Sequence, residues 1–182
     1  VSNSCIPIKN FNHIYQLVLQ NKKSWFNYYI PNAKQGSRNH YSRIKSLKLP
    51  IIKYAVIHEQ WMILDRTHAK ILDANTYLLK HFNIKKLIPD EMYYLTALHY
   101  LQPNIFKQIQ FPLQTRKTYL QHNNITYAKW YDPITKKWQI NHPAVFDKMS
   151  NYDLKVIKHS SALFARKFSK KSNIDKYWTD IV

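Results

Sequence analysis

The sequence contains only two glutamates, and one of them, Glu91, has the setting of a general base. It lies in the segment Ile-Pro-Asp-Glu-Met-Tyr, where Pro89 suits the first turn of a helix. The dipole and free N–H groups of a helix start favour an ionised carboxylate, which a general base must be. The same pattern also fits ordinary charge placement at a helix start. Adjacent helical side chains point about 100° apart, so Asp90 and Glu91 do not form a facing pair for glycoside hydrolysis.

Other common catalytic and metal-binding motifs are absent from the sequence. The single cysteine, Cys5, excludes an internal disulfide and a Cys-based zinc site. His58 and Glu59 are not followed by a second histidine at the spacing of a zinc protease motif. Because Gly36 is the only glycine, a Gly-rich phosphate loop is also excluded.

A basic segment near the end of the chain, Leu-Phe-Ala-Arg-Lys-Phe at 163–168, has the pattern of an amphipathic strand. If it is extended, Phe164 and Phe168 lie on one side with Arg166 between them, and Lys167 points to the opposite face. Such a segment can present a cation to a phosphate. The alternative is a strand whose charges are simply solvated.

Length and composition indicate a folded, strongly basic protein. The 182 residues suit one domain or a piece of a larger one, and 45% of them are apolar, which is enough for a sizeable core. The formal net charge is +18 at pH 7, so the surface will attract nucleic acid, anionic membranes or phosphate-bearing substrates. The positive residues are spread along the whole chain, which is also typical of a solvated basic face. No apolar run is long enough to span a membrane.

The elements that would position these residues alternate between helix and strand. Helices are predicted at 10–20, with Asn10 as N-cap and Phe11, Ile14, Leu17 and Val18 on one face, and at 66–82, with Asp65 as N-cap. Further helices are predicted at 90–101, 152–159 and the C-terminus. Strands are predicted at 24–30, 60–64, 125–130 and 162–168, whereas 31–50 looks like a loop. This alternation predicts an α/β domain.

Five segments, taken in order, resemble the core-2/I-branching β-N-acetylglucosaminyltransferase-like family, which includes peptide-O-xylosyltransferases and plant relatives. They are Ser-Asn-Ser-Cys-Ile-Pro-Ile-Lys-Asn-Phe at 2–11, Gln-Trp-Met-Ile-Leu-Asp-Arg-Thr-His-Ala at 60–69, Pro-Asp-Glu-Met-Tyr at 89–93, Ile-Thr-Tyr-Ala-Lys-Trp at 125–130 with His-Pro-Ala at 142–144, and the basic segment at 163–168. The resemblance covers essentially the whole chain, and we expect the family's N-terminal nucleotide-binding half to lie outside it. Residues 1–182 are thus expected to be a single portion of a glycosyltransferase domain.

The resemblance implies a GT-A-type α/β fold and inverting transfer of a sugar, of N-acetylglucosamine or xylose type, from a UDP-sugar to a hydroxyl group. In this family the base falls on Glu91 and the cation that binds the donor diphosphate falls on Lys167, with Arg166 beside it. The acceptor-binding positions match Trp130 and, more loosely, Arg38 and Trp61.

Three departures from the family pattern bear on the mechanism. The turn at 2–5 holds no carboxylate for Mg²⁺ or Mn²⁺, so we expect no metal and no cofactor beyond the UDP-sugar substrate. A second basic residue of the family aligns with Ala144, so that either Arg166 or His142 substitutes for it or leaving-group stabilisation is weaker. An acceptor-site tyrosine is replaced by Asp132, which leaves the acceptor open.

The expected partners are a nucleotide-sugar donor and a glycan or glycoprotein acceptor, with no specific nucleic acid and with a membrane anchor outside this chain. The resemblance implies the Golgi or another endomembrane compartment. The composition, rich in residues with A/T-rich codons, also suits a virus, for which the cytoplasm or a virus factory is expected. Two alternatives to the enzyme remain: a basic module that binds nucleic acid or another polyanion, and an inactive glycosyltransferase remnant.

Overall fold

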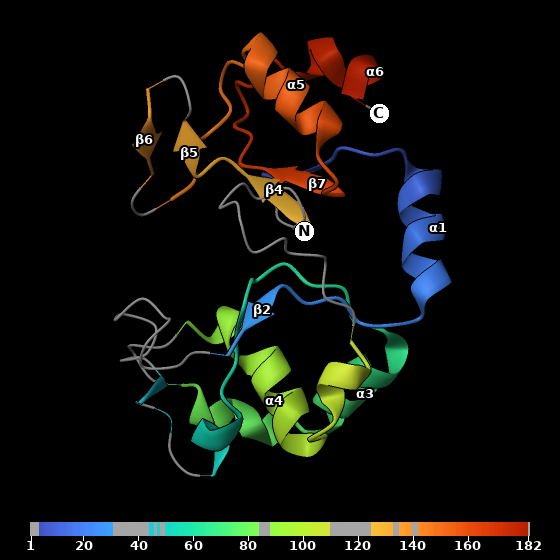
Figure 1. Cartoon of the computed structure of the whole chain (residues 1–182), viewed down its shortest axis with the longest axis vertical. Helices are drawn as coiled ribbons and strands as arrows, with labels where there is room; N and C mark the ends of the chain where they lie inside the picture. Colours follow the sequence, from blue (N-terminus) through green and yellow to red (C-terminus); the bar gives the residue numbers. More distant parts are fainter. Residues whose placement is uncertain are drawn as a thin grey trace. The chain divides into compact units, whose positions relative to one another are not determined.

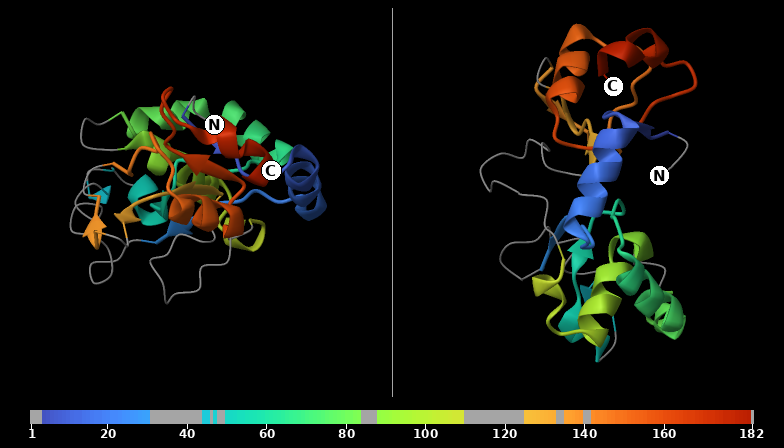
Figure 2. Two further views of the ribbon diagram at one scale, coloured as in Figure 1. Left: turned by 90° about the horizontal axis from the view of Figure 1, so that it is seen from above. Right: turned by 90° about the vertical axis from the view of Figure 1, so that its right-hand side faces the viewer.

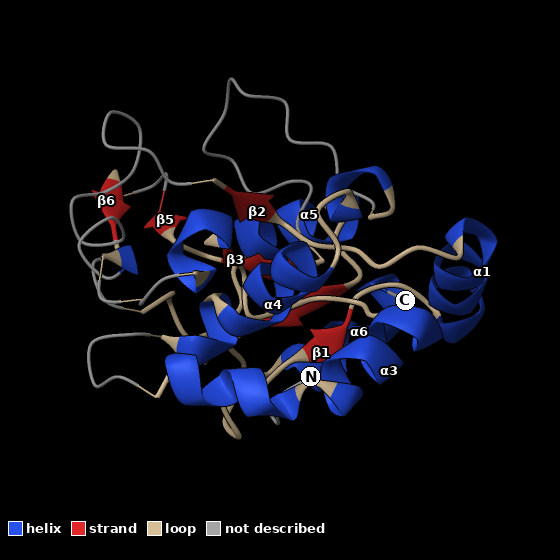
Figure 3. Ribbon diagram, turned by 90° about the horizontal axis from the view of Figure 1, so that it is seen from below, coloured by secondary structure: helices blue, strands red, loops and turns tan. Residues whose placement is uncertain are grey.

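A computed structural model of the chain describes residues 4–30, 44–45, 47, 50–83, 88–109, 125–132, 135–139 and 142–181. The chain divides into two compact units, which are described separately (Figure 1). The terminal unit consists of Val1–Asn21 and Leu113–Val182, and the central unit consists of Lys22–Pro112. Helices and short strands occur in both units, so the described residues have the mixed α/β character that the sequence predicts (Figure 3).

The terminal unit is organised around a three-stranded sheet in the order β1-β7-β4. Strand β7 (Phe164–Arg166) is central, antiparallel to β1 (Ile6–Pro7) and parallel to β4 (Thr126–Ala128). Ala165 lies opposite Ile6 on one side and Tyr127 on the other, and it is fully buried. A small side chain at this central position lets the core beside the sheet pack closely. That core consists of Ile8, Phe146, Met149, Ile157, Ala162, Ala165, Phe168, Ile174 and Ile181.

Helices and a hairpin complete the terminal unit. Helix α5 (Asn151–His159) is capped by Ser150, whose side chain accepts from the Asp153 N–H while the Asp153 side chain accepts from the Ser150 N–H, a reciprocal capping box. The C-terminal helix predicted from the sequence is a 3₁₀ turn, Ile174–Tyr177, followed by α6 (Trp178–Ile181). A separate hairpin pairs β5 (Tyr131–Asp132) with β6 (Lys137–Trp138).

Helix α1 (Phe11–Asn21) confirms the helix predicted at 10–20. Its N-cap is Asn10, whose side-chain oxygen accepts from the His13 N–H at 2.8 Å. The predicted apolar face is only partly covered, because Ile14, Leu17 and Val18 are half-buried while Phe11 is 74% exposed and stacks on Tyr15. Helical periodicity therefore identified the element but did not report how deeply its face is buried.

The central unit packs helices against a small antiparallel sheet. Strand β2 (Tyr28–Tyr29) pairs with β3 (Ile57–His58), with Tyr28 opposite His58. Helix α3 (Arg66–Ala74) packs against α4 (Tyr93–Leu101), and both lie in the green part of the ribbon (Figure 2). Four 3₁₀ turns, at Ile51–Tyr54, Thr76–His81, Pro89–Glu91 and Ile105–Lys107, connect the described elements.

Burial in the central unit is concentrated on α4. Leu95, Ala97 and Leu98 are fully buried, and so is Thr96, whose hydroxyl donates to the Val56 carbonyl and accepts from the Val56 N–H. This exchange satisfies the backbone polar groups of Val56 inside the core. Around α4, the core includes Phe26, Ile44, Leu47, Ile51, Ala55, Val56, Ile57, Leu72, Leu78, Phe82, Met92, Tyr93, Ile105 and Ile109.

The predicted strands are longer than the observed ones, and one was misplaced. The strand predicted at 60–64 is wrong, because β3 lies earlier, at Ile57–His58, and only Ile63 forms an isolated bridge, to Trp25. Of the strand predicted at 24–30, only Tyr28–Tyr29 is regular. Those predicted at 125–130 and 162–168 contain β4 and β7. Alternation alone does not show which backbone groups find a partner strand, so it overextends short strands.

The helix predicted at 66–82 is shorter than expected. Asp65 caps α3 as predicted, accepting from the His68 N–H at 2.9 Å, but the helix ends at Ala74 and not at residue 82. The Asn75 side chain donates to the Ile71 carbonyl, and the chain continues as a 3₁₀ turn. Asn readily makes such local bonds, which compete with helix propagation.

The helix predicted at 90–101 is divided at Met92. Pro89 starts a 3₁₀ turn that ends at Glu91, and α4 begins only at Tyr93. Met92 has φ −135° and its side chain is almost fully buried. Burial of this side chain in the core accompanies the break, so Glu91 lies on a short turn before α4 and not within its first turn. The helix predicted at 152–159 is confirmed, and part of the predicted loop at 31–50 lies outside the described residues.

Candidate active site

One edge of the terminal sheet brings together several of the segments singled out in the sequence. Because β4 and β7 are parallel, their C-terminal ends lie at the same edge. Lys167 follows β7 directly, and Trp130 follows β4 by two residues. Antiparallel β1 brings Ser4 to this edge, where its carbonyl accepts from the Phe168 N–H at 2.9 Å. This is the edge at which α/β sheets commonly bind ligands.

The two cations of the basic segment are half-buried at this edge. The Lys167 carbonyl accepts from the Phe146 N–H at 2.8 Å, so the segment that contains Ala144 lies beside Lys167. The position at which the resemblance leads one to expect a second basic residue, Ala144, thus belongs to a segment beside Lys167. His142, one of the two substitutes considered, has an exposed side chain, whereas Arg166 lies within β7.

The predicted alternation of the basic segment is wrong beyond Arg166. Ala165 and Phe168 belong to the same core although they are three positions apart, while half-buried Phe164 lies outside that core. Phe164 and Phe168 therefore do not share a face. The regular strand ends at Arg166, and Phe168 instead pairs with Phe146 in an isolated parallel bridge.

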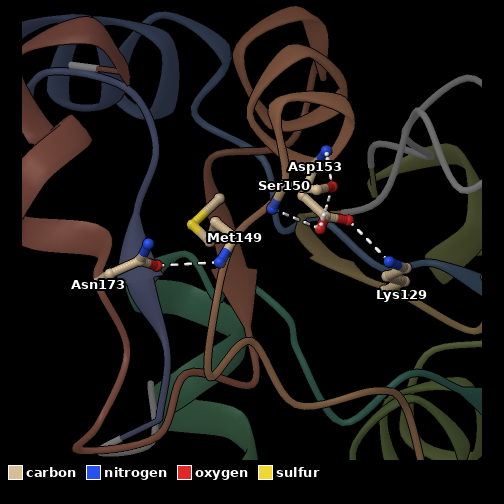
Figure 4. Close-up of polar contacts among 5 residues, drawn as sticks. All are labelled: Lys129, Met149, Ser150, Asp153 and Asn173. Carbon is tan, nitrogen blue, oxygen red and sulfur yellow. Dashed lines mark hydrogen bonds and ion pairs between the residues drawn. The ribbon is translucent and has the colours of Figure 1, made fainter.

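A buried ion pair anchors the segment that leaves β4. Lys129 Nζ lies 2.8 Å from Asp153 Oδ1, and the two side chains are 14% and 7% exposed (Figure 4). The other carboxylate oxygen of Asp153 accepts from the Ser150 N–H and hydroxyl at 3.1 and 2.7 Å. One carboxylate thus joins the start of α5 to the backbone that precedes Trp130. Next to this segment, the Met149 N–H donates to the Asn173 side chain (Figure 4).

The same carboxylate affects its neighbour Tyr127. Burial, with added repulsion from the charge of Asp153 and from Tyr152, raises the pKa of Tyr127 to about 12. Tyr127 is therefore a neutral side chain at physiological pH. Its ring stacks against Phe146, so it belongs to the packing of the terminal unit.

Trp130 is held by backbone bonds on both sides. Its N–H donates to the Ala128 carbonyl at 3.1 Å, and its carbonyl accepts from the Gln139 N–H at 2.8 Å. The side chain is half-buried, unlike a fully enclosed core tryptophan. In the adjoining hairpin, Tyr131 lies against Trp138, with ring centroids 5.1 Å apart, and Trp138 is 54% exposed. Aromatic faces in this setting can stack on the apolar face of a sugar ring.

In the central unit, a hydrogen bond places two predicted site residues near each other. Gln60 Nε2 donates to Asp90 Oδ2 at 2.9 Å. The next residues along the chain are Trp61 and Glu91, and both are half-buried. The bond thus connects the segment after β3 to the 3₁₀ turn that contains Glu91. Neither Gln60 nor its contact with Asp90 was predicted, because the sequence gives no local signal for a contact over 30 residues.

A buried histidine lies beside this connection. His58 is 2% exposed, with its ring near those of Phe26 and Tyr94, at centroid distances of 5.5 and 6.0 Å. Its Nδ1 lies 2.7 Å from the Glu59 carbonyl oxygen, so Nδ1 donates the hydrogen bond. Burial lowers the pKa of His58 to about 4, against the opposing effects of that bond and of the charge on Asp90. His58 is therefore neutral near pH 7.

A Ser–Asp–His cluster at the start of α3 was also missed in part. The Ser24 hydroxyl donates to Asp65 Oδ2 at 3.0 Å, accepts from the Asp65 N–H, and lies 2.8 Å from His68 Nδ1. Ser24 and His68 are buried, so this hydroxyl is not accessible to a substrate. Burial disfavours the ionised form of Asp65, but the hydrogen bonds and charge of His68 hold its pKa below the ordinary value. The cluster therefore stabilises the fold.

The predicted site residues belong to both units of the chain. Glu91 and Trp61 lie in the central unit, whereas Trp130, Arg166 and Lys167 lie in the terminal unit. Arg38 lies outside the described residues. Within the described ranges, no group of three or more His, Cys, Asp or Glu side chains is suited to hold a metal ion. No helix in that part of the chain is long and apolar enough to cross a membrane.

Comparison with protein families defines the class of this protein as a glycosyltransferase. The chain belongs to the core-2/I-branching enzyme family, whose sequence profile matches residues 1–158. This confirms the family predicted from the five segments. A search of curated proteins gave no significant match.

Proposed function

We propose that this chain catalyses inverting transfer of a sugar from a UDP-sugar to a hydroxyl of a glycan or glycoprotein, within a GT-A-type fold. Membership of a glycosyltransferase family supports the reaction class. The observation that supports the site most directly is the turn Pro89–Glu91, which presents a half-buried carboxylate and is bonded through Asp90 to the residue before Trp61.

Each proposed site residue has a distinct role in this reaction. Glu91 takes the proton of the acceptor hydroxyl as its oxygen attacks the anomeric carbon and the bond to the diphosphate breaks. Lys167, assisted by Arg166, neutralises the negative charge on the departing diphosphate. Trp130 stacks on the acceptor sugar, and Trp61 and Arg38 complete acceptor binding. Holding the hydroxyl in line accounts for a large part of the rate.

The reaction is proposed to proceed without a divalent metal, on the basis of the sequence Ser-Asn-Ser-Cys at residues 2–5. This segment holds no carboxylate, while Lys167 follows β7 directly and the next residue, Phe168, donates its N–H to the Ser4 carbonyl. We expect transfer to continue in excess EDTA. Loss of activity in EDTA, restored by Mn²⁺ or Mg²⁺, would show that a metal takes part.

Exchange of Glu91 for glutamine tests the assignment of the base. Glu91→Gln keeps the size of the side chain and removes its basicity, so transfer is expected to fall by roughly 10²–10⁴-fold with little change in folding. The measurement is release of UDP and formation of product from a panel of UDP-sugars and glycan acceptors. Glu59→Gln, the change at the other glutamate, is the matched control. Wild-type turnover by Glu91→Gln would contradict the assignment.

The formal charge of +18 supports a second candidate, a module that binds nucleic acid or another polyanion. Such binding depends on the release of counterions and weakens steeply as salt increases. Binding to heparin and to duplex DNA would be measured between about 50 and 200 mM salt. Tight polyanion binding together with no transfer from any UDP-sugar would favour this candidate over the enzyme.

Family members typically reside in the Golgi, and we propose the same compartment for this protein. Donor sugars are available in the Golgi lumen, where glycoprotein acceptors also pass. Localisation of the tagged full-length protein would test this placement, and the cytoplasm or a virus factory is the alternative outcome.

A further inference from the structure

The hydrogen bond from Gln60 to Asp90 joins two segments whose next residues, Trp61 and Glu91, have proposed roles in the reaction. The donor and acceptor atoms are 2.9 Å apart, and the acceptor is a carboxylate, so the bond is charge-assisted. The two residues are 30 positions apart in the chain. The contact therefore constrains the turn that contains Glu91 relative to the segment after β3.

The backbone on the Gln60 side of this bond is fixed. The Glu59 N–H donates to the Asn27 carbonyl at 2.9 Å, which continues the pairing of β2 with β3. The next residue back along the chain, His58, packs near Phe26 and Tyr94. Gln60 consequently projects from a backbone that is held by the β2–β3 pairing.

On the Asp90 side, the residue that follows the turn is held in the core, whereas the turn itself is held by its backbone hydrogen bonds. Met92 is almost fully buried, and its N–H donates to the Pro89 carbonyl at 3.2 Å. The Glu91 N–H donates to the Ile88 carbonyl at 3.0 Å. Apart from these bonds of the turn itself, Gln60 supplies a contact from a different element. Removing it would take away this contact between the segment after β3 and the turn.

We propose that Gln60 is a positioning residue for Glu91, acting through Asp90, so that the base faces the acceptor hydroxyl. The proposal rests on the assignment of Glu91 as the base. A small displacement of a catalytic group reduces the rate of the chemical step more than it reduces substrate binding. The effect of losing the bond is therefore expected in kcat, with the KM of the UDP-sugar donor nearly unchanged.

The central experiment compares Gln60→Ala with Gln60→Lys under saturating donor and acceptor. Alanine removes the side-chain amide that donates the hydrogen bond to Asp90, so kcat should fall about 3–10-fold, the rate equivalent of one modest hydrogen bond. Lysine restores a hydrogen-bond donor for Asp90 and should recover most of the lost kcat. Gln16→Ala, at an exposed glutamine on α1, is the matched control and should leave kcat unchanged.

A second measurement does not depend on turnover. Amide hydrogen exchange at Glu91 and Met92 should be faster in Gln60→Ala than in wild type and should return towards wild type in Gln60→Lys. Asp90→Asn, which keeps an acceptor oxygen but removes the charge, should lie between these variants in both measurements. Because the bond lies at the surface, these variants are expected to fold, and far-ultraviolet circular dichroism checks that they do.

The outcomes separate failure of this inference from failure of the proposed function. If Glu91→Gln is inactive but Gln60→Ala keeps wild-type kcat and wild-type exchange, the positioning role is overturned and the base assignment stands. If Glu91→Gln retains full activity, the base assignment and the positioning role both fail. A fall in kcat with Gln60→Ala that Gln60→Lys does not recover would also overturn the hydrogen-bond mechanism.

Discussion

The two units hold their candidate site residues by different physical means. In the terminal unit, the segments around Trp130 and Lys167 are attached to a sheet, and a buried ion pair between Lys129 and Asp153 ties one of them to α5. In the central unit, a side-chain bond at the surface joins Gln60 to Asp90 on the turn that contains Glu91. Nearby, the buried ring of His58 is neutral near pH 7.

The difference indicates what each unit can tolerate. A buried ion pair adds little net stability but is costly to break, because the remaining charge has lost both water and partner. A surface hydrogen bond can be lost with a modest effect on folding. Loss of the Lys129–Asp153 ion pair should therefore appear first in stability, and loss of the Gln60–Asp90 bond should appear first in rate.

The largest effect is expected from Lys129→Met. This change leaves the carboxylate of Asp153 buried without its cation, so the free energy of unfolding should fall by about 3–5 kcal/mol. Chemical unfolding followed by circular dichroism measures this loss. Lys148→Met, at an exposed lysine of the same unit, is the control and should change stability by less than about 0.5 kcal/mol. Equal stability of the two variants would show that the ion pair does not anchor the segment.

Acidification should weaken the central unit through His58. The folded state resists protonation of this buried ring, whereas the unfolded state binds a proton near pH 6.5, so stability falls as pH drops from about 6.5 to about 4. Lowering the pKa from 6.5 to about 4 corresponds to about 3 kcal/mol of unfolding free energy.

The variant His58→Phe should flatten this pH dependence while keeping an aromatic ring between Phe26 and Tyr94. His13→Gln, at an exposed histidine, should leave it unchanged. The low pKa of Asp65 acts in a separate window: its contribution is present above about pH 4 and is lost only as pH falls further. A pH profile of His58→Phe identical to that of wild type would contradict the role given to His58.

Removal of the Lys167 side chain should weaken UDP binding by about 1.5–3 kcal/mol, the scale of a charge-assisted hydrogen bond. Calorimetry with UDP measures this loss. Arg166→Ala should have a smaller effect if Lys167 alone binds the diphosphate. If Arg166 replaces the cation that is absent at Ala144, both variants should lose affinity to a similar degree. Wild-type affinity in Lys167→Ala would remove Lys167 from the site.

A smaller effect is expected from Ser24→Ala. This change removes a donor to Asp65 and an acceptor for the Asp65 N–H inside the central unit, so stability should fall by about 1–2 kcal/mol. Thermal unfolding measures it. Ser161→Ala, at an exposed serine of the terminal unit, is the comparison variant. Equal melting temperatures for these variants would show that the cluster contributes little.

Much of the fold could be predicted because its signals are local. Asn10 and Asp65 cap their helices through bonds to residues three positions ahead, and such caps can be recognised in a sequence. Strand limits were predicted poorly, since β3 and β7 are short and their ends depend on which partner each backbone group finds. The division of the helix at Met92 was also missed, because burial of that side chain depends on the whole core.

The sequence by itself determined the family, the residue types of the candidate site and the basic character of the surface. Tertiary structure alone decided which distant residues pair: Gln60 with Asp90 and Lys129 with Asp153 beside the candidate site, and Ser24 with Asp65 inside the central unit. These contacts join residues 30, 24 and 41 positions apart. Periodicity and capping patterns report only interactions within a few residues. A distant pair is fixed by the packing of whole elements, so its partners become identifiable only when those elements are placed in three dimensions.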